Sequence, residues 1–220
     1  MSNDITKLTL PLSDEQGRSL KLGQIVTLTG RIFTGRSRFH IRAVAENIVP
    51  PVDFDSVNCF FHVGPVVARE KDSWRVVSAE PTSSIRFGQY GARVIRRFGL
   101  RTLIGKTTMG QEVVEALRDV GGVFLSKIGL CGNQLASQVK RVVTVYFAEE
   151  LGKTEATWVF DVEDFGPFFV AIDAHGNSYF EELDKEVTDR LPQVEAALGI
   201  RSDFAFTDVH AGGSGNTSTP

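Results

Sequence analysis

Cysteine is scarce in this sequence, and its scarcity limits the metal chemistry that the chain can perform alone. Only Cys59 and Cys131 occur among the 220 residues, too few to hold an iron–sulfur cluster by thiolates alone. The sequence has no CxxC pair and no HExxH segment, and its four histidines are scattered. We therefore predict no metal site built by this chain alone, and two buried free thiols in a reducing compartment.

A long apolar run and an excess of positive charge are also missing. No stretch approaches the roughly 20 apolar residues that a membrane span needs, and the start, MSNDITK, has neither the basic nor the apolar region of a secretory signal. The net charge of −3 gives no general attraction to nucleic acid or anionic lipid. We therefore expect a cytoplasmic protein with no membrane and no nucleic-acid partner.

The composition is that of an ordinary globular protein, with 42% apolar and 23% charged residues. A chain of 220 residues is long enough for one domain with a well-buried core. The final segment, AGGSGNTSTP, contains almost nothing that could be buried. We predict one domain over residues 1–210 and a disordered tail over residues 211–220.

Hydrophobic periodicity predicts a mixed α/β domain. Apolar runs indicate strands at residues 8–12, 25–29, 57–67 (broken at 64–65), 74–79, 103–104, 123–125, 142–147, 157–162 and 168–172. Amphipathic segments indicate helices at residues 37–46, 90–98, 111–120, 131–138 and 182–198. Residues 14–23 and the acidic residues 161–164 are predicted to be solvated connections, and Gly30 to end a strand. Because strands and helices alternate between residues 78 and 125, we expect some parallel pairing.

Two predicted loops in this alternating region carry hydroxyl groups beside a cation. The first is TSSIR at residues 82–86, and the second is GKTT at residues 105–108. Both follow predicted strands, and in parallel sheets the loops at the carboxyl ends of strands gather at one edge and bind ligands. Cations and hydroxyls gathered in this way suit a small dicarboxylate, so we predict half of an active site here.

Arg36 follows another predicted strand, and two interpretations of it are open. Its guanidinium could bind a substrate carboxylate bidentately, which a lysine would do less specifically. Alternatively, it is an exposed arginine near a helix start, with Arg38 and Arg42 on a solvated face, and the local sequence favours this second interpretation. His40 lies four residues after Arg36 and shares its helical face.

The other candidate residues also have simpler explanations. Thr82 could cap a helix; as a base its hydroxyl would need an activating neighbour, and no motif in this chain supplies one. For Arg86, ligand-binding and exposed positions are about equally favoured. Lys106 is either a carboxylate-binding cation or a surface lysine, because a phosphate loop would need glycine where Leu100 stands. His62 is expected to be a hydrogen-bonded histidine near the core rather than a catalyst.

Short motifs along the chain point to a known family. They are TGRSRFH at residues 34–40, HVGPVV at 62–67, EPTSSIR at 80–86, GKTTM at 105–109, EDFGP at 163–167 and DAHGN at 173–177. In order and spacing they resemble the β-type chain, or C-terminal domain, of the iron–sulfur hydro-lyases that include class I fumarases and L(+)-tartrate dehydratase. The resemblance covers about residues 8–182. It implies a swivelling β/β/α domain that closes over a [4Fe–4S] cluster held by three cysteines of an α subunit.

The resemblance also implies roles for individual residues. Thr82 would be the catalytic base, activated by an acidic residue of the partner. The side chains that would bind the dicarboxylate are Arg36, Arg86 and Lys106. The residues that would support them from behind are His40, His62 and Ser83. The expected assembly is a hetero-oligomer acting on tartrate, malate/fumarate or a close analogue.

The chain departs from the family pattern at several positions. Glu80 replaces a glycine, Thr107 and Thr108 replace two more, and SRF at residues 37–39 replaces an Asp and small residues. Bulkier side chains where glycine lets the backbone approach a ligand would reshape the pocket. The main hypothesis is therefore a hydro-lyase β subunit. The alternative is a non-catalytic paralogue that binds a dicarboxylate or regulates its partner.

Overall fold

The computed structural model describes residues 5–129 and 131–200. The chain divides into two compact units, one up to Glu181 and the other from Glu182 onward. The predicted domain end at residue 210 and the predicted tail at 211–220 lie outside the described residues. Within the described part, no helix is both long and apolar enough to cross a membrane.

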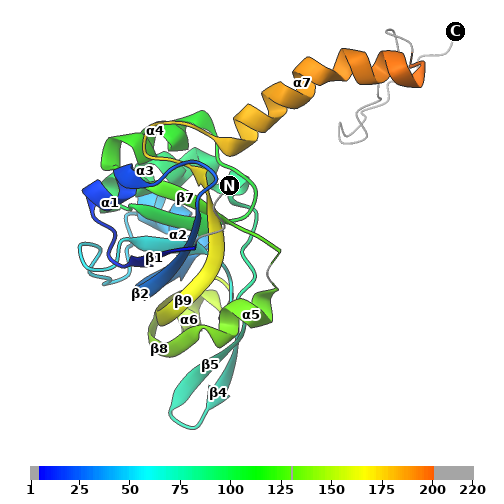
Figure 1. The fold of residues 1–220 in the computed structure, drawn as a ribbon. Helices are drawn as coiled ribbons and strands as arrows, with labels where there is room; N and C mark the ends of the chain where they lie inside the picture. Colours follow the sequence, from blue (N-terminus) through cyan, green and yellow to red (C-terminus); the bar gives the residue numbers. More distant parts are fainter. Residues whose placement is uncertain (1–4, 130, 201–220) are drawn as a thin grey trace, which may run out of the picture. The chain divides into compact units, whose positions relative to one another are not determined.

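A seven-stranded mixed sheet forms the centre of the first unit (Figure 1). Its strands are, in spatial order, β1 (Thr6–Thr9), β2 (Ile25–Gly35), β3 (Cys59–His62), β6 (Thr102–Gly105), β7 (Val123–Lys127), β9 (Thr157–Ile172) and β8 (Val139–Tyr146). The first five pair in parallel, and β9 runs antiparallel to both β7 and β8. Because β9 also pairs with β2, the sheet closes on itself. The predicted mixed α/β class with parallel pairing is confirmed.

Helices and one hairpin complete the described chain. The helices are α1 (Asp14–Ser19), α2 (Ser37–Ile41), α3 (Gly88–Phe98), α4 (Gln111–Val120), α5 (Gly132–Ser137), α6 (Ala148–Leu151) and α7 (Tyr179–Leu198). A π-helical turn, Arg42–Glu46, extends α2, and a 3₁₀ turn, Ser84–Phe87, leads into α3. The hairpin consists of β4 (Val66–Glu70) and β5 (Ser73–Ser78).

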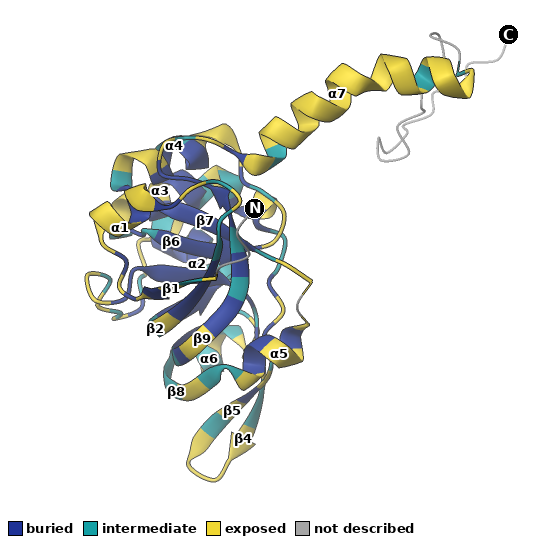
Figure 2. Cartoon of the chain, viewed as in Figure 1, coloured by how far each residue is buried: buried dark blue, intermediate teal, exposed yellow. Residues whose placement is uncertain are grey.

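The interior parallel strands β3 and β6 are buried on both faces, so alternate side chains of each strand pack into two different clusters. In β3, Phe61 packs among residues enclosed by the closed sheet, whereas its neighbour Phe60 packs with residues of α3 and α4. Ile104 and Leu103 divide between the same two clusters in β6. Figure 2 shows the resulting buried centre. The buried side chains of α3 and α4, among them Ile95, Val113 and Leu117, belong to the second of these clusters.

Two predicted interruptions are wrong, because the strands continue through them. β2 runs through Gly30, whose φ of 138° is accommodated beside a register shift in the pairing with β9. The segment from 157 to 172 is one long strand, so the acidic residues at 161–164 lie within β9 and not in a turn, although Glu163 and Asp164 are exposed as predicted. Glycine tolerates this positive φ without the steric cost that a Cβ would bring. Long-range pairing thus overrides a local turn signal.

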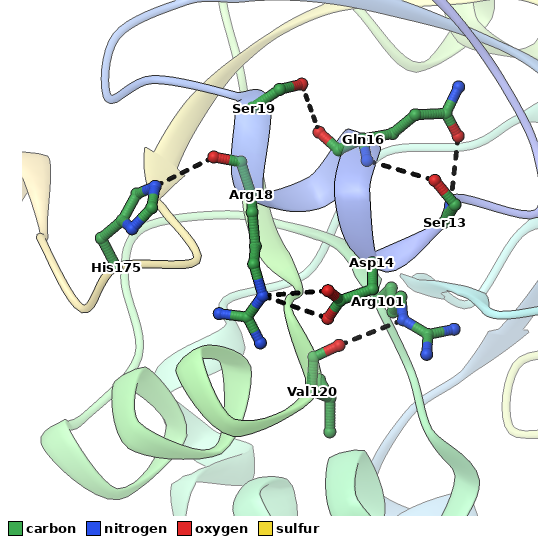
Figure 3. A network of polar contacts seen from close by, with 8 residues as sticks. All are labelled: Ser13, Asp14, Gln16, Arg18, Ser19, Arg101, Val120 and His175. Atoms are coloured by element: carbon green, nitrogen blue, oxygen red, sulfur yellow. Dashed lines mark hydrogen bonds and ion pairs between the residues drawn. The ribbon is translucent and has the colours of Figure 1, made fainter.

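Residues 14–23 were predicted to be a connection but contain α1. A capping box starts this helix: the Gln16 N–H donates to the Ser13 hydroxyl at 3.1 Å, and the Ser13 N–H donates to the Gln16 side chain at 3.1 Å. Arg18 pairs with Asp14 one turn apart, and the carbonyl of Arg18 contacts His175 Nε2 at 2.9 Å (Figure 3). Caps and a distant histidine therefore compensate for a helix too short to be stable alone.

The second unit begins within α7. The predicted helix at residues 182–198 is confirmed, and it starts slightly earlier, at Tyr179. Its apolar side chains are exposed: Leu183, Val187, Leu191, Val194 and Leu198. Pro192 lies inside the helix.

Candidate active site

The register of the parallel strands aligns the residues that lead into the site. Gly35 at the end of β2 pairs with His62 at the end of β3. Phe61 pairs with Ile104, so His62 and Gly105 are the next residues along these two neighbouring strands. Arg36 and Lys106 follow Gly35 and Gly105 directly. Two of the predicted cations therefore leave the sheet at the same edge, at the carboxyl ends of parallel strands.

The Thr82 loop is attached to this same edge. The Thr82 N–H donates to the carbonyl of His62 at 2.8 Å, so the loop starts directly above β3. Ser83 then forms a parallel bridge with Lys106, and the Ser84 N–H donates to the Lys106 carbonyl at 3.0 Å. The predicted convergence of the two loops is confirmed. The chemical roles of their residues stay predictions.

Thr82 and Arg86 contact each other directly. An Nη of Arg86 donates to the Thr82 hydroxyl oxygen, and Arg86 Nε donates to the Ser83 carbonyl at 3.4 Å. The turn that follows begins at Ser84 without any side-chain cap, so Thr82 does not serve as the helix cap. A guanidinium beside a hydroxyl favours loss of the hydroxyl proton, because the positive charge stabilises the resulting alkoxide. The chain thus supplies part of the activation that its motifs do not reveal.

Arg36 is not the exposed arginine that its local sequence favours. Its side chain is 24% exposed, and its nearest carboxylate partner is Glu155, with Nη1 and Oε1 3.6 Å apart. Its buried Nε has no hydrogen-bond partner in the part of the chain that the structure describes. A Cβ added to Gly64 would lie 2.8 Å from Arg36 Cδ, so this glycine leaves room for the side chain at the end of β3. Sequence patterns do not identify Glu155, which lies far away in the chain.

Arg42 also differs from its prediction as part of a solvated face. It is 5% exposed, and it pairs with Glu150 at 2.9 Å between Nη1 and Oε2. Its guanidinium lies over the ring of Phe147, 4.4 Å from the centroid. Arg42 therefore holds α6 against the turn after α2 and is separate from the candidate site.

Two buried histidines lie behind the site. His40 Nδ1 donates to the Arg36 carbonyl at 2.9 Å, and His62 Nδ1 contacts Ser84 Oγ at 2.8 Å. The centroids of the two imidazole rings are 5.3 Å apart. Burial lowers the pKa of His40 to about 4, and burial, followed by the charge of His40, lowers the pKa of His62 well below its usual value. Both rings are therefore neutral near pH 7, and both contact segments that carry candidate residues.

Positions 107 and 80 show how the chain accommodates its departures from the family pattern. Thr107 has a φ of 69°, a conformation that favours glycine, and its hydroxyl contacts Ser83 Oγ at 3.4 Å. Glu80 forms an ion pair with Lys127 at the end of β7, the strand next to β6. The substituted side chains thus form new contacts around the loops.

Lys106 is exposed, and its ammonium group makes no ion pair within residues 5–129 and 131–200. The strand β6 runs directly up to it, so no glycine-rich loop precedes it and the phosphate-loop alternative has no structural basis. Arg86 likewise has no carboxylate partner among the described residues. Two cations at this edge are therefore available to an anionic ligand.

The described residues do not offer a ligand set for an iron–sulfur cluster. No three of their His, Cys, Asp or Glu side chains lie close enough to hold a metal ion. Cys59 is buried, and burial raises the pKa of its thiol, so it stays protonated. Cys131 is exposed, which corrects the expectation that both thiols are buried.

Known proteins are similar to this chain over nearly the whole first unit. A family model described as "Fumarase C-terminus" matches residues 2–183. A Methanocaldococcus jannaschii protein named "Putative L(+)-tartrate dehydratase subunit beta" is 37% identical over 83% of this chain and 95% of its own length. The Escherichia coli K12 "L(+)-tartrate dehydratase subunit beta" is 32% identical over 83% of this chain and 90% of its own length.

A longer relative carries the same region as one part of a larger chain. The Geobacillus stearothermophilus protein named "Putative fumarate hydratase class I" is 36% identical over 86% of this chain but over only 36% of its own length. The same region thus occurs both as a separate subunit-sized chain and within a longer polypeptide. With a family match over residues 2–183 and these relatives, the chain belongs to the fumarase C-terminus family.

Proposed function

We propose that this chain is the β subunit of a [4Fe–4S]-dependent hydro-lyase that reversibly removes water from a small hydroxy-dicarboxylate such as tartrate or malate. Membership of a family whose relatives are named tartrate dehydratase and fumarate hydratase supports the reaction class. The single observation that carries the proposal is the gathering of Arg36, Lys106 and the Thr82–Arg86 pair at one edge of the parallel strands.

The proposed base is the Thr82 hydroxyl. Dehydration requires removal of a proton from the carbon beside a carboxylate, and the hydroxyl must itself be deprotonated to accept it. The hydrogen bond from Arg86 stabilises the alkoxide form, and an acidic residue of the partner would take up the hydroxyl proton. Thr82 is therefore proposed to receive the substrate proton while Arg86 lies close to the developing charge.

The proposed substrate-binding groups are the three cations. Arg36 has a partly exposed guanidinium whose closest carboxylate partner is 3.6 Å from Nη1, so it is not held in a bidentate ion pair and could bind a substrate carboxylate. Lys106 and Arg86 carry positive charge with no carboxylate partner among the described residues. As the proton leaves, negative charge builds on the adjacent carboxylate, and fixed cations stabilise that charge.

The cluster is proposed to belong to an α subunit, held by three cysteines of that chain. When bound, it would supply a Lewis acid for the departing hydroxyl group. This chain would close the site from the other side as part of a hetero-oligomer. Because the described part of this chain lacks a ligand set, the proposal requires that the cluster arrive with the partner.

Thr82→Ala and Thr82→Ser in the co-purified α–β complex test this assignment. Loss of the hydroxyl should lower kcat by about 1,000-fold, within the range for removing a proton-transfer group, while Thr82→Ser should keep most of the activity. Ser137→Ala removes an exposed hydroxyl on α5 as a matched control and should leave turnover unchanged. Full turnover of Thr82→Ala on tartrate and malate, measured anaerobically by absorbance, would exclude Thr82 as the base.

A second candidate is a non-catalytic paralogue that binds a dicarboxylate or regulates its partner. Thr107 in a glycine-favouring conformation and Glu80 paired with Lys127 favour it, because both change the surroundings of the proposed pocket. A reconstituted complex that binds dicarboxylate in a calorimetric titration but does not dehydrate it would support this candidate. A neighbouring reading frame that encodes three well-spaced cysteines would favour the enzyme instead.

A further inference from the structure

Ser84, which the sequence motifs do not distinguish from its neighbours, is the most completely bonded residue of the candidate site. It is fully buried, and its N–H donates to the Lys106 carbonyl at 3.0 Å. In return, the Lys106 N–H donates to Ser84 Oγ at 3.3 Å. The same oxygen lies 2.8 Å from His62 Nδ1. Ser84 therefore links the backbone of Lys106 to a buried imidazole.

The space for this contact exists only because residue 105 is glycine. A Cβ added to Gly105 would lie 1.9 Å from Ser84 Oγ and 2.9 Å from the ring of Phe124. No side chain could be accommodated there without moving the Ser84 hydroxyl away from Lys106. The last residue of β6 thus admits the serine hydroxyl into the sheet edge.

The direction of the Ser84–His62 bond depends on the His62 tautomer. Ser84 Oγ accepts the Lys106 N–H and keeps both its own proton and a second lone pair, so it can donate to His62 Nδ1 or accept from it. In both tautomers the buried Nε2 of His62 has no hydrogen-bond partner among the described residues. His62 is completely buried and its own carbonyl accepts the Thr82 N–H, so it contacts the Thr82 loop at two points, Thr82 and Ser84.

We propose that Ser84 and His62 are positioning residues that fix the Lys106 cation relative to Thr82 for carboxylate binding. This inference rests on the proposed function, since it specifies how one of its substrate-binding groups is oriented. Ser84 fixes both the N–H and the carbonyl of Lys106, so the lysine leaves the sheet in a single direction. If the loop shifted, the buried polar groups of Ser84 and Lys106 would lose their hydrogen-bond partners. This loss costs free energy, so the contact also keeps the loop in register.

Asn58 provides a matched structural control. It lies just before the opposite end of the same strand, β3, and is also buried. Its side chain bonds the Leu12 backbone in the same reciprocal way, accepting from the N–H at 3.0 Å and donating to the carbonyl at 2.8 Å. Asn58→Ala therefore removes a comparable buried clamp that lies away from the candidate site.

The kinetic test uses the α–β complex with tartrate or malate as substrate. Ser84→Ala should raise KM about 10-fold or more with a smaller change in kcat, because the misplaced lysine binds the ground-state carboxylate less well. Asn58→Ala should destabilise the chain by a similar or larger amount and leave KM unchanged. His62→Asn keeps a polar group near the Nδ1 position and should retain lower KM values than His62→Leu. Equal KM values for wild type, Ser84→Ala and His62→Leu would overturn the proposal.

A second measurement on the full chain separates this inference from the proposed function. Amide hydrogen exchange of Lys106, followed by NMR, should accelerate about 10-fold or more in Ser84→Ala and stay unchanged in Asn58→Ala. If the wild-type complex has no dehydratase activity but this acceleration occurs, the proposed function fails and the positioning of Lys106 stands. If the exchange rate does not change, the positioning inference fails, whatever the activity of the complex.

Discussion

Two arginines on the same segment, Arg31 and Arg36, show how differently one residue type is used in this protein. Arg31 lies within β2 and donates to both oxygens of Asp161, at 2.7 and 3.3 Å. Arg36 lies just after the same strand, and its closest carboxylate is 3.6 Å away. The first has a complete bidentate partner, whereas the second has a buried Nε without one among the described residues.

The difference separates a structural ion pair from a candidate binding group. Asp161 also accepts from Arg141 on β8, so it joins β2, β9 and β8 across the sheet. The hydrogen bond from Arg31 lowers the pKa of Asp161, and the same bond raises the pKa of Arg31. At the carboxyl ends of the strands, by contrast, the positive charge of Arg36 is not taken up by a bidentate ion pair. Whether an arginine forms a structural ion pair or a candidate binding group thus depends on whether it lies within the strand or just after its end.

The same substitution at both arginines tests this difference directly. Arg36→Lys removes the bidentate fork and should lower kcat/KM of the complex about 100-fold, or about 2.7 kcal/mol in transition-state stabilisation. Arg31→Lys makes the same chemical change in the structural pair and should leave kcat/KM within about twofold. Equal losses in both variants would show that the two positions do not differ in the proposed way.

Two lysines, Lys106 and Lys140, allow the same kind of test. Lys106→Met should raise KM about 30-fold, because a charged hydrogen bond to the substrate carboxylate is lost. Lys140→Met removes an exposed lysine that pairs with Glu163 at 2.9 Å and should change KM by less than twofold. Steady-state kinetics on the same dicarboxylate would measure both, and an unchanged KM for Lys106→Met would contradict its assigned role.

The buried histidines predict a pH effect on stability that the surface pairs do not share. The folded-state pKa of His40 is about 4, below the unfolded value near 6.5, so the unfolded state binds protons first as pH falls. The stabilisation is complete above pH 6.5 and is lost as pH falls toward 4. Between pH 7 and 5, His40 alone should lower the free energy of unfolding by about 2 kcal/mol. Urea denaturation of wild type and His40→Asn should show a smaller pH-dependent loss in the variant.

The smallest expected effect concerns Asp161. Its folded-state pKa is lowered, so its contribution is complete above the unfolded value and is lost as pH falls through the folded value. Asp161→Asn should therefore destabilise the chain by about 1 kcal/mol at pH 7 and by less below pH 3, as expected for a partly exposed pair. Denaturation midpoints at both pH values would measure this. A loss of the same size at pH 7 and pH 3 would mean that charge is not the cause.

The sequence indicates the candidate edge because its signals are local. The apolar runs before residues 82 and 105 predict strands, and loops that follow parallel strands lie at one edge by topology alone. The Thr82 loop and Lys106 are therefore brought together as expected, through Ser83 and Ser84. Their proximity needed only the order of strands and helices, which periodicity reveals.

The remaining features depend on contacts between distant residues. Ser84 is set apart from Ser83 by its burial and its contacts with His62 and Lys106, and Glu155 contacts Arg36 across a separation that no local pattern encodes. The continuation of β2 through Gly30 requires β9 as a partner, so a local turn signal predicted the wrong outcome. Arg42 was expected to be solvated because its burial depends on Phe147 and Glu150.

The alignment of three interior strands has a consequence for the length of ligand that the site can accept. Arg36 leaves β2 and Lys106 leaves β6, with β3 between them. Adjacent strands lie roughly 4.8 Å apart, so the two side chains start about 10 Å from each other. Each of the three strands is hydrogen-bonded to a neighbouring strand on both sides, so none can shift without breaking backbone hydrogen bonds. A dicarboxylate bound as we propose would therefore have to bridge two groups whose starting points the sheet keeps a fixed distance apart.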